Sequence, residues 1–172
     1  MSIQKLTLEE ETKLLLTTKN IPEFNLIGDI KICKVISVYD GDTIKVCFYH
    51  NGIINKWNIR LIGLDTPELR PSRKLPNREE EIKKAKESRD YLKSILLTNN
   101  ESKLFYLKCY DFDKYGRLLG EIFNYQPILF DATNTTTNNT QIGGSTSILH
   151  PLSINTLMIT NNYAKYYDGG KR

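Results

Sequence analysis

Residues 30–61, IKICKVISVYDGDTIKVCFYHNGIINKWNIRL, decide the fold of this chain. Apolar and polar residues alternate on both sides of an Asp-Gly-Asp interruption at residues 40–42, which is the period expected of a half-buried strand. Asp and Gly are poor strand residues, so the interruption marks a bend. Asn51-Gly52 is a strong signal for a two-residue hairpin turn. The stretch therefore predicts three consecutive strands, and the alternating apolar residues of the first are Ile30, Ile32, Ile36 and Val38.

The rest of the chain adds helices and two more strands. Asn77 and Glu80 are predicted to cap a helix that follows a basic, proline-containing linker. Its apolar side would carry Ile82, Ala85, Arg89, Leu92 and Leu96. Residues 103–110 and 118–123 flank a polar turn and predict a second hairpin, and a short helix is expected after residue 153. Five strands with a helix after the third favour an α+β fold, a five-stranded OB-type Greek-key barrel with two to three helices.

Two segments lie outside this predicted domain core. Residues 1–28 are expected to be an N-terminal extension with a helix, because Thr7 and Glu10 form a potential capping box before a leucine-rich run. That helix could pack on the core or serve as a partner-binding arm. Residues 29–172 would then form one domain, in which residues 131–147, rich in Asn, Thr, Gly and Ser, are predicted to be a flexible insertion.

Composition narrows the possible functions. The chain has 172 residues and a net charge of +4, which permits a polyanionic ligand without requiring one. It has no run of 18 apolar residues, so no membrane-spanning helix is expected. The acidic N-terminal segment does not resemble a signal peptide, and an intracellular location is expected. Three cysteines without ligand spacing predict buried thiols, and two histidines leave little material for a zinc site.

Four short islands concentrate the charged residues that could carry chemistry: DGDT (40–43), RLIGLDTPE (60–68), DKYGR (113–117) and YYDGGK (166–171). Carboxylates such as those of Asp42, Asp65 and Glu68 suit a hard cation. The guanidinium groups of Arg60 and Arg117 suit phosphate oxygens. Together these groups can support attack on a phosphodiester. Each island also has a plainer interpretation, since Asp-Gly and Asp-Thr-Pro are common turn sequences.

The first three islands, in this order and at these spacings, resemble the staphylococcal nuclease family over residues 30–125, with a weaker similarity over 153–171. The resemblance implies an OB-fold, calcium-dependent nuclease. Such an enzyme hydrolyses DNA, RNA or both with little sequence preference and leaves 3′-phosphate ends. It also implies a monomer that prefers single-stranded nucleic acid.

The resemblance implies a metal site and assigns its ligands. Asp42 and Asp65 would bind Ca²⁺ through their carboxylates, Thr66 would add its backbone carbonyl, and Asp40 would lie in the outer coordination shell. Second-sphere carboxylates of this kind orient the direct ligands of a metal.

The resemblance also assigns roles in catalysis and binding. Glu68 would activate or orient the attacking water, while Arg60 and Arg117 would stabilise the five-coordinate phosphorane. Because an arginine does not readily give up a proton, Arg117 is expected to act as a charge stabiliser and hydrogen-bond donor. The expected substrate contacts are Lys114, Tyr115 and Tyr167.

Three points stay open at the level of sequence. The loop residues Arg70, Arg73 and Lys74 could contact phosphates or simply be solvated. A non-catalytic nucleic-acid-binding or scaffold module on the same fold is an alternative to the enzyme. A phosphodiesterase for a small nucleotide or a lipid headgroup is a further one. The presence of both arginines and all three carboxylates favours the nuclease.

Overall fold

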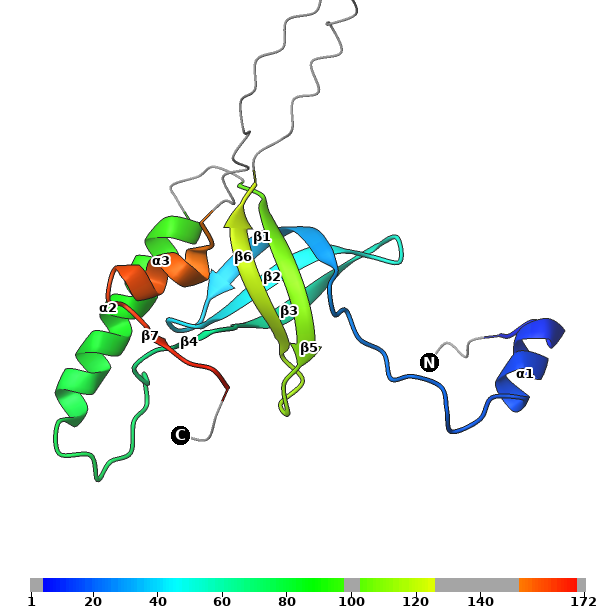
Figure 1. Cartoon of the computed structure of the whole chain (residues 1–172), viewed down its shortest axis with the longest axis horizontal. Helices are drawn as coiled ribbons and strands as arrows, with labels where there is room; N and C mark the ends of the chain where they lie inside the picture. Colours follow the sequence, from blue (N-terminus) through cyan, green and yellow to red (C-terminus); the bar gives the residue numbers. More distant parts are fainter. Residues whose placement is uncertain (1–4, 98–102, 126–151, 170–172) are drawn as a thin grey trace, which may run out of the picture.

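A computed structural model describes residues 5–97, 103–125 and 152–169. Five strands close into a barrel in the order β1-β2-β3-β6-β5, and all neighbours are antiparallel except the parallel pair β3–β6 (Figure 1). The strands are β1 (Ile30–Val38), β2 (Thr43–His50), β3 (Ile53–Leu61), β5 (Phe105–Phe112) and β6 (Leu118–Asn124). The predicted α+β, OB-type barrel is thereby confirmed.

The hairpin between β2 and β3 forms where the sequence predicted it. Asn51 and Gly52 both have positive φ angles, 50° and 78°, as the right-handed twist of a two-residue hairpin requires. The two strands pair in continuous register from Thr43 opposite Arg60 to His50 opposite Ile53. This register places the end of β3 beside the start of β2, where the Asp-Gly-Asp turn lies.

The inward face of β1 differs from the apolar alternation in the sequence. Ile30, Ile32 and Ile36 are exposed, whereas Cys33 and Val35 point into the barrel. The register of β1 against β2 shifts between Val35 and Ser37. Such a bulge places an extra residue in one strand and breaks the period of two. The alternation therefore located the strand correctly but identified the wrong face for its first half.

Helix α2 (Arg78–Leu96) buries one side against the barrel through Ala85, Ser88, Leu92 and Leu96. The predicted contact residues Ile82 and Arg89 are only half-buried, and Ser88 was not predicted. Asn77 is the N-cap residue, as predicted, but its side chain makes no capping hydrogen bond, so the predicted capping interaction is wrong. Two of the buried residues, Ala85 and Ser88, are small, which lets the helix approach the β1–β2 turn closely.

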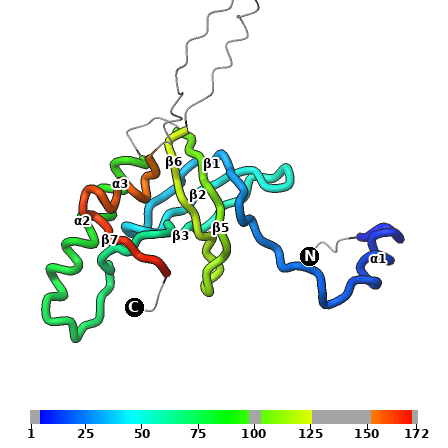
Figure 2. The backbone as a smooth tube through the Cα atoms, in the orientation of Figure 1, coloured from blue at the N-terminus to red at the C-terminus, as the bar shows by residue number. Residues whose placement is uncertain are grey.

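Helix α3 (Ile154–Thr160) is capped by Ser153, whose hydroxyl accepts a hydrogen bond from the Thr156 amide. The buried side chain of Asn155 fastens this helix to the barrel. Its amide nitrogen donates to the carbonyls of Ile62 (2.9 Å) and Gly120 (3.2 Å), and its oxygen accepts from the Ile122 amide. The chain after α3 is thereby directed towards the end of β3 (Figure 2).

Helix α1 (Leu8–Leu15) begins with the predicted capping box, because Thr7 and Glu10 bond each other's backbone and side chain. None of its residues is buried, and it lies away from the barrel in Figure 1. Packing on the core, one of the two alternatives, therefore does not occur. The predicted insertion at 131–147 lies outside the described residues. Within the described ranges, the helices are too short or too polar to cross a membrane.

Candidate active site

Segments from five parts of the chain meet at one end of the barrel and line a cleft of about 930 Å³. They are the β1–β2 turn, the end of β3, the loop after β4 (Leu64–Asp65), the β5–β6 hairpin, and the tail after β7 (Lys165–Tyr166). The predicted site residues in its wall are Asp40, Asp42, Arg60, Thr66, Glu68, Lys114, Tyr115, Arg117 and Tyr167. Asp65 does not line the cleft, but its carboxylate contacts Arg60, which does.

The β1–β2 turn owes its shape to Asp40 and Gly41. The Asp40 carboxylate accepts a hydrogen bond from the Asp42 amide (3.1 Å), which closes the turn. A Cβ atom on Gly41 would lie 2.1 Å from the Ser88 hydroxyl and 2.8 Å from the Thr66 methyl. Glycine is therefore needed here for close packing. The small residue in the middle of the Asp-Gly-Asp motif lets the turn lie against helix α2.

Asp42 is the most buried charged group of the cleft, with 7% of its surface exposed. Its two carboxylate oxygens accept hydrogen bonds from the hydroxyls of Thr43 (2.9 Å) and Thr66 (3.1 Å). Burial raises the pKa of Asp42 and repulsion from Asp40 raises it further, against the lowering effects of Arg60 and Thr43. Burial and repulsion thus make the charged form of Asp42 less favourable, which is common for functional groups.

Arg60, at the end of β3, lies between two carboxylates. Its Nη1 is 2.6 Å from Asp42 Oδ2 and its Nη2 is 3.5 Å from Asp65 Oδ1. The Nη1 contact is ionic without the geometry of a hydrogen bond, and within the described part of the chain this buried nitrogen has no hydrogen-bond acceptor. Arg60 therefore keeps donor capacity that an oxygen in the cleft could use.

The β5–β6 hairpin supplies the second arginine and a partner that the sequence interpretation did not assign. Asp113 accepts hydrogen bonds from Arg117 Nε (2.7 Å) and from the amides of Tyr115 and Arg117. Burial raises the pKa of Asp113, but these bonds outweigh it and hold the pKa below its usual value. Arg117 Nη1 donates to the Thr43 hydroxyl (3.2 Å), which in turn bonds Asp42. The sequence signal that could have identified Asp113 is an aspartate four residues before an arginine, with a glycine turn between them.

The C-terminal tail reaches the cleft because β7 pairs with β4. Leu64 lies opposite Tyr166 and Asp65 opposite Lys165, and the Tyr167 amide donates to the Gly63 carbonyl (3.1 Å). Tyr167 consequently lines the cleft. Two further wall residues, Tyr39 and Arg70, were not assigned a role from the sequence, although Arg70 belongs to the basic loop that was left open.

A family model described as staphylococcal nuclease homologue matches residues 58–169, more than half of the chain. The chain belongs to the staphylococcal nuclease homologue family. The match includes Arg60, Glu68, Arg117 and Tyr167, so most of the residues that line the cleft lie within the family range. It begins after the Asp-Gly-Asp turn, whose place in the cleft comes from the structure. A search of curated protein sequences finds no significant match.

The cleft of this staphylococcal nuclease homologue offers oxygen ligands of the type that Ca²⁺ prefers. The mutual repulsion of Asp40 and Asp42 is also the kind of unfavourable charge that a cation relieves. The donor set fits the ion in its chemistry. Across residues 5–97, 103–125 and 152–169, however, no three His, Cys, Asp or Glu side chains converge as a metal-binding group. In this structure Arg60 lies between Asp42 and Asp65. Coordination of one Ca²⁺ ion by both carboxylates stays a prediction.

Proposed function

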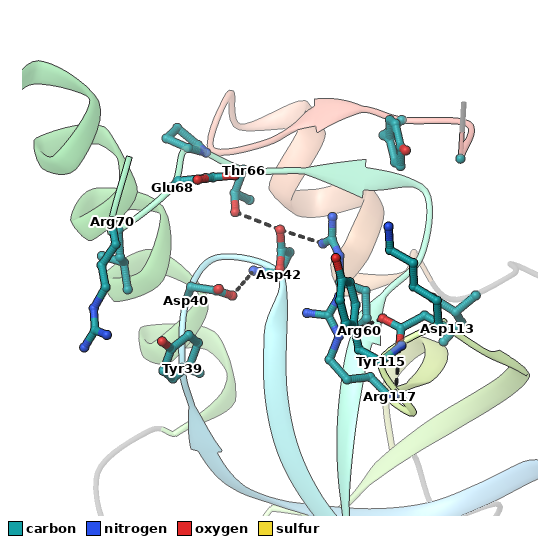
Figure 3. A pocket seen from close by; sticks show the side chains of 16 residues that line it. Tyr39, Asp40, Asp42, Arg60, Thr66, Glu68, Arg70, Asp113, Tyr115 and Arg117 are labelled. Carbon is teal, nitrogen blue, oxygen red and sulfur yellow. Dashed lines mark hydrogen bonds and ion pairs between the residues drawn. The ribbon is translucent and has the colours of Figure 1, made fainter. Parts of the chain in front are cut away.

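We propose that this protein is a calcium-dependent nuclease that hydrolyses DNA, RNA or both with little sequence preference and leaves 3′-phosphate ends. One observation carries the proposal: Asp42, Arg60, Glu68 and Arg117 come from four separate segments and all line one cleft (Figure 3). Two guanidinium groups and two carboxylates in one cleft supply charge stabilisation and a proton acceptor without histidine. The proposed enzyme acts as a monomer.

Each of these side chains has a distinct task in the proposed reaction. Glu68 accepts a proton from, or orients, the water whose oxygen forms the new bond to phosphorus. The bond from phosphorus to the 5′ oxygen breaks, which leaves the phosphate on the 3′ side. Arg60 and Arg117 donate hydrogen bonds to the phosphoryl oxygens as their negative charge grows. The proton for the departing 5′ oxygen comes from solvent, because arginine keeps its own.

Asp42, Asp65 and the Thr66 carbonyl would hold the calcium ion, with Asp40 in the outer coordination shell. When bound, Ca²⁺ would neutralise charge on the phosphate. Lys114 and Tyr115 would contact a neighbouring phosphate, and Tyr167 would stack on a base. The exposed position of Tyr115 in the β5–β6 hairpin supports such a contact.

One structural observation favours the second candidate, a nucleic-acid-binding module without catalysis. The charge of Arg60 is already balanced by Asp42 and Asp65. The guanidinium can leave them for a phosphate only when these carboxylates bind another cation. A cation shared by the two carboxylates would do this. The two candidates therefore differ in whether divalent cations change what the protein does to nucleic acid.

The deciding experiment measures release of acid-soluble nucleotides from denatured DNA and from RNA, with Ca²⁺, with Mg²⁺ alone and with a chelator. Glu68→Gln is the test variant. Glu87→Gln, an exposed position on α2 outside the cleft, is the matched control. We expect calcium-dependent release that is lost in Glu68→Gln and retained in Glu87→Gln. Binding of DNA without release in any metal would establish the non-catalytic module instead.

A further inference from the structure

The cleft continues on both sides of Asp42, and each side carries an exposed tyrosine beside an arginine. In Figure 3, Tyr115 and Arg117 lie on one side of Asp42, while Tyr39 and Arg70 lie on the other. On the first side the cation and ring are in contact: the Arg117 guanidinium is 5.6 Å from the Tyr115 ring centre. The family resemblance had assigned Tyr115 to substrate binding. The opposite side has no assigned role.

Tyr39 is held firmly but its ring is open to solvent. It directly follows β1, and its amide donates to the Thr43 carbonyl (2.9 Å) within the same turn that positions Asp42. Even so, 57% of its surface is exposed. Its ring contacts no other aromatic ring, and its hydroxyl bonds to no other residue in the described ranges. A fixed backbone with a free aromatic face suits a planar ligand more than it suits the core.

Arg70 complements this ring with charge. It follows the Thr66–Glu68 segment, lines the same cleft and is exposed. It forms no ion pair with any residue that the structure describes, whereas Arg60 and Arg117 are both paired with carboxylates. An unpaired guanidinium at the rim of an anion-binding cleft is available for a phosphate without first losing a partner.

We propose that Tyr39 and Arg70 form a second nucleotide subsite, in which a base stacks on Tyr39 and the adjoining phosphate binds Arg70. This inference rests on the proposed function and specifies its substrate. With one subsite on each side of Asp42, the ligand is a strand that spans the cleft. Because a base must leave its helical stack to lie on a tyrosine, that strand is single-stranded. Stacking is tolerant of sequence, in keeping with little sequence preference.

The test measures binding without catalysis, by fluorescence anisotropy of labelled oligothymidylates of two and eight nucleotides in the presence of chelator. Tyr39→Ala and Arg70→Ala are the test variants. The matched controls are Tyr49→Ala, a similarly exposed tyrosine on β2 outside the cleft, and Arg73→Ala in the same loop as Arg70. Tyr39→Phe keeps the ring and tests whether stacking is the cause. All four positions are exposed, so folding is expected to be retained in the five variants.

We expect the wild-type protein to bind the octamer more tightly than the dimer. Tyr39→Ala should weaken octamer binding by about 5- to 150-fold, the range for loss of one stacked base, and should remove most of the gain from length. Tyr39→Phe should bind like the wild type. A Tyr39→Ala protein that binds the octamer as Tyr49→Ala does would overturn the subsite and leave the nuclease intact. A wild-type protein that binds neither oligonucleotide would also overturn the subsite, whereas the nuclease is decided separately by the calcium-dependent release of nucleotides.

Discussion

Gly41 lies where the β1–β2 turn meets helix α2, and the absence of a side chain there sets the position of Asp40 and Asp42. Gly41→Ala would place a methyl group 2.1 Å from the Ser88 hydroxyl. We expect a loss of about 1–3 kcal/mol in the free energy of unfolding, as is typical of overpacking. Activity should fall with it, because the turn must move away from the helix. Denaturant unfolding followed by tryptophan fluorescence measures the loss.

A double-mutant cycle checks this cause. Ser88→Ala removes the hydroxyl that meets the new methyl group, so Gly41→Ala should cost less in that background. The recovery should be partial, because the Thr66 methyl at 2.8 Å remains. Equal costs in both backgrounds would show that Gly41 matters for another reason, such as the conformation of its backbone.

Arg117 contacts three groups with one planar side chain, which a lysine cannot reproduce. Its Nε bonds Asp113, its Nη1 bonds Thr43, and its guanidinium lies near the Tyr115 ring. Arg117→Lys keeps the charge and loses the fork, so we expect hydrolysis to fall by about 100-fold or more. The control is Arg73→Lys, an exposed residue outside the cleft. Near wild-type turnover in Arg117→Lys would disprove its role in stabilising the transition state.

Strand geometry sorts the three cysteines into two classes. Cys33 and Cys109 point into the barrel, whereas Cys47 is half-buried on β2. Burial raises the pKa of Cys33 to about 12 and that of Cys109 to about 11. Since the thiolate is the reactive form, neither should react at pH 8 in the folded protein. We expect one fast equivalent with a thiol reagent in native protein and three in denaturant; Cys47→Ser should abolish the fast one.

The N-terminal helix α1 makes no buried contact, so its removal should leave the barrel unchanged. We expect deletion of residues 1–16 to shift the melting temperature by no more than about 2 °C. Leu26, by contrast, is 3% exposed and belongs to the core. Leu26→Ala should cost about 2–5 kcal/mol. A large loss of thermal stability on deleting α1 would show that the helix docks on the barrel in solution.

Elements defined by neighbouring residues were predictable from the sequence. The β2–β3 hairpin depends on Asn51-Gly52, and α1 depends on Thr7 and Glu10, all of which act locally. The inward face of β1 was not predictable, because the shift between Val35 and Ser37 is set by pairing with β2. Alternation in one strand carries no information on that shift.

The same distinction applies to the site. Charged islands identified the residues that line the cleft, since turns that carry both carboxylates and arginines are chemically conspicuous. Their partners could not be found this way. The contact of Arg60 with Asp42 and the bond from Arg117 to Thr43 join residues far apart in sequence. Tyr39 was missed because an exposed tyrosine at a strand end has no distinctive pattern.

At the scale of the whole molecule, the proposed nucleic-acid binding should depend on salt. Without a bound cation, Arg60 stays paired with Asp42 and Asp65, and the other cations of the cleft wall that could meet phosphates on either side of Asp42 are Arg70, Lys114 and Arg117. Three phosphate contacts on a single strand predict that log K falls with log salt concentration with a slope of roughly −2. Titration of the octamer at NaCl concentrations from about 50 to about 300 mM measures this slope. Arg70→Ala should reduce the slope by about 0.7, and an unchanged slope would contradict a phosphate contact at that residue.

The parallel pair β3–β6 has a consequence for the order of folding. It joins Ile59 to Leu118, residues about 60 positions apart, whereas β1–β2, β2–β3 and β5–β6 are hairpins between neighbours in sequence. Hairpins form within microseconds, and contacts between distant residues form more slowly because a long loop must close first. Asp42 and Arg117 lie on opposite sides of that closure. The cleft is therefore expected to form only after that loop has closed, and a chain that has formed only its hairpins has no site to bind or cut nucleic acid.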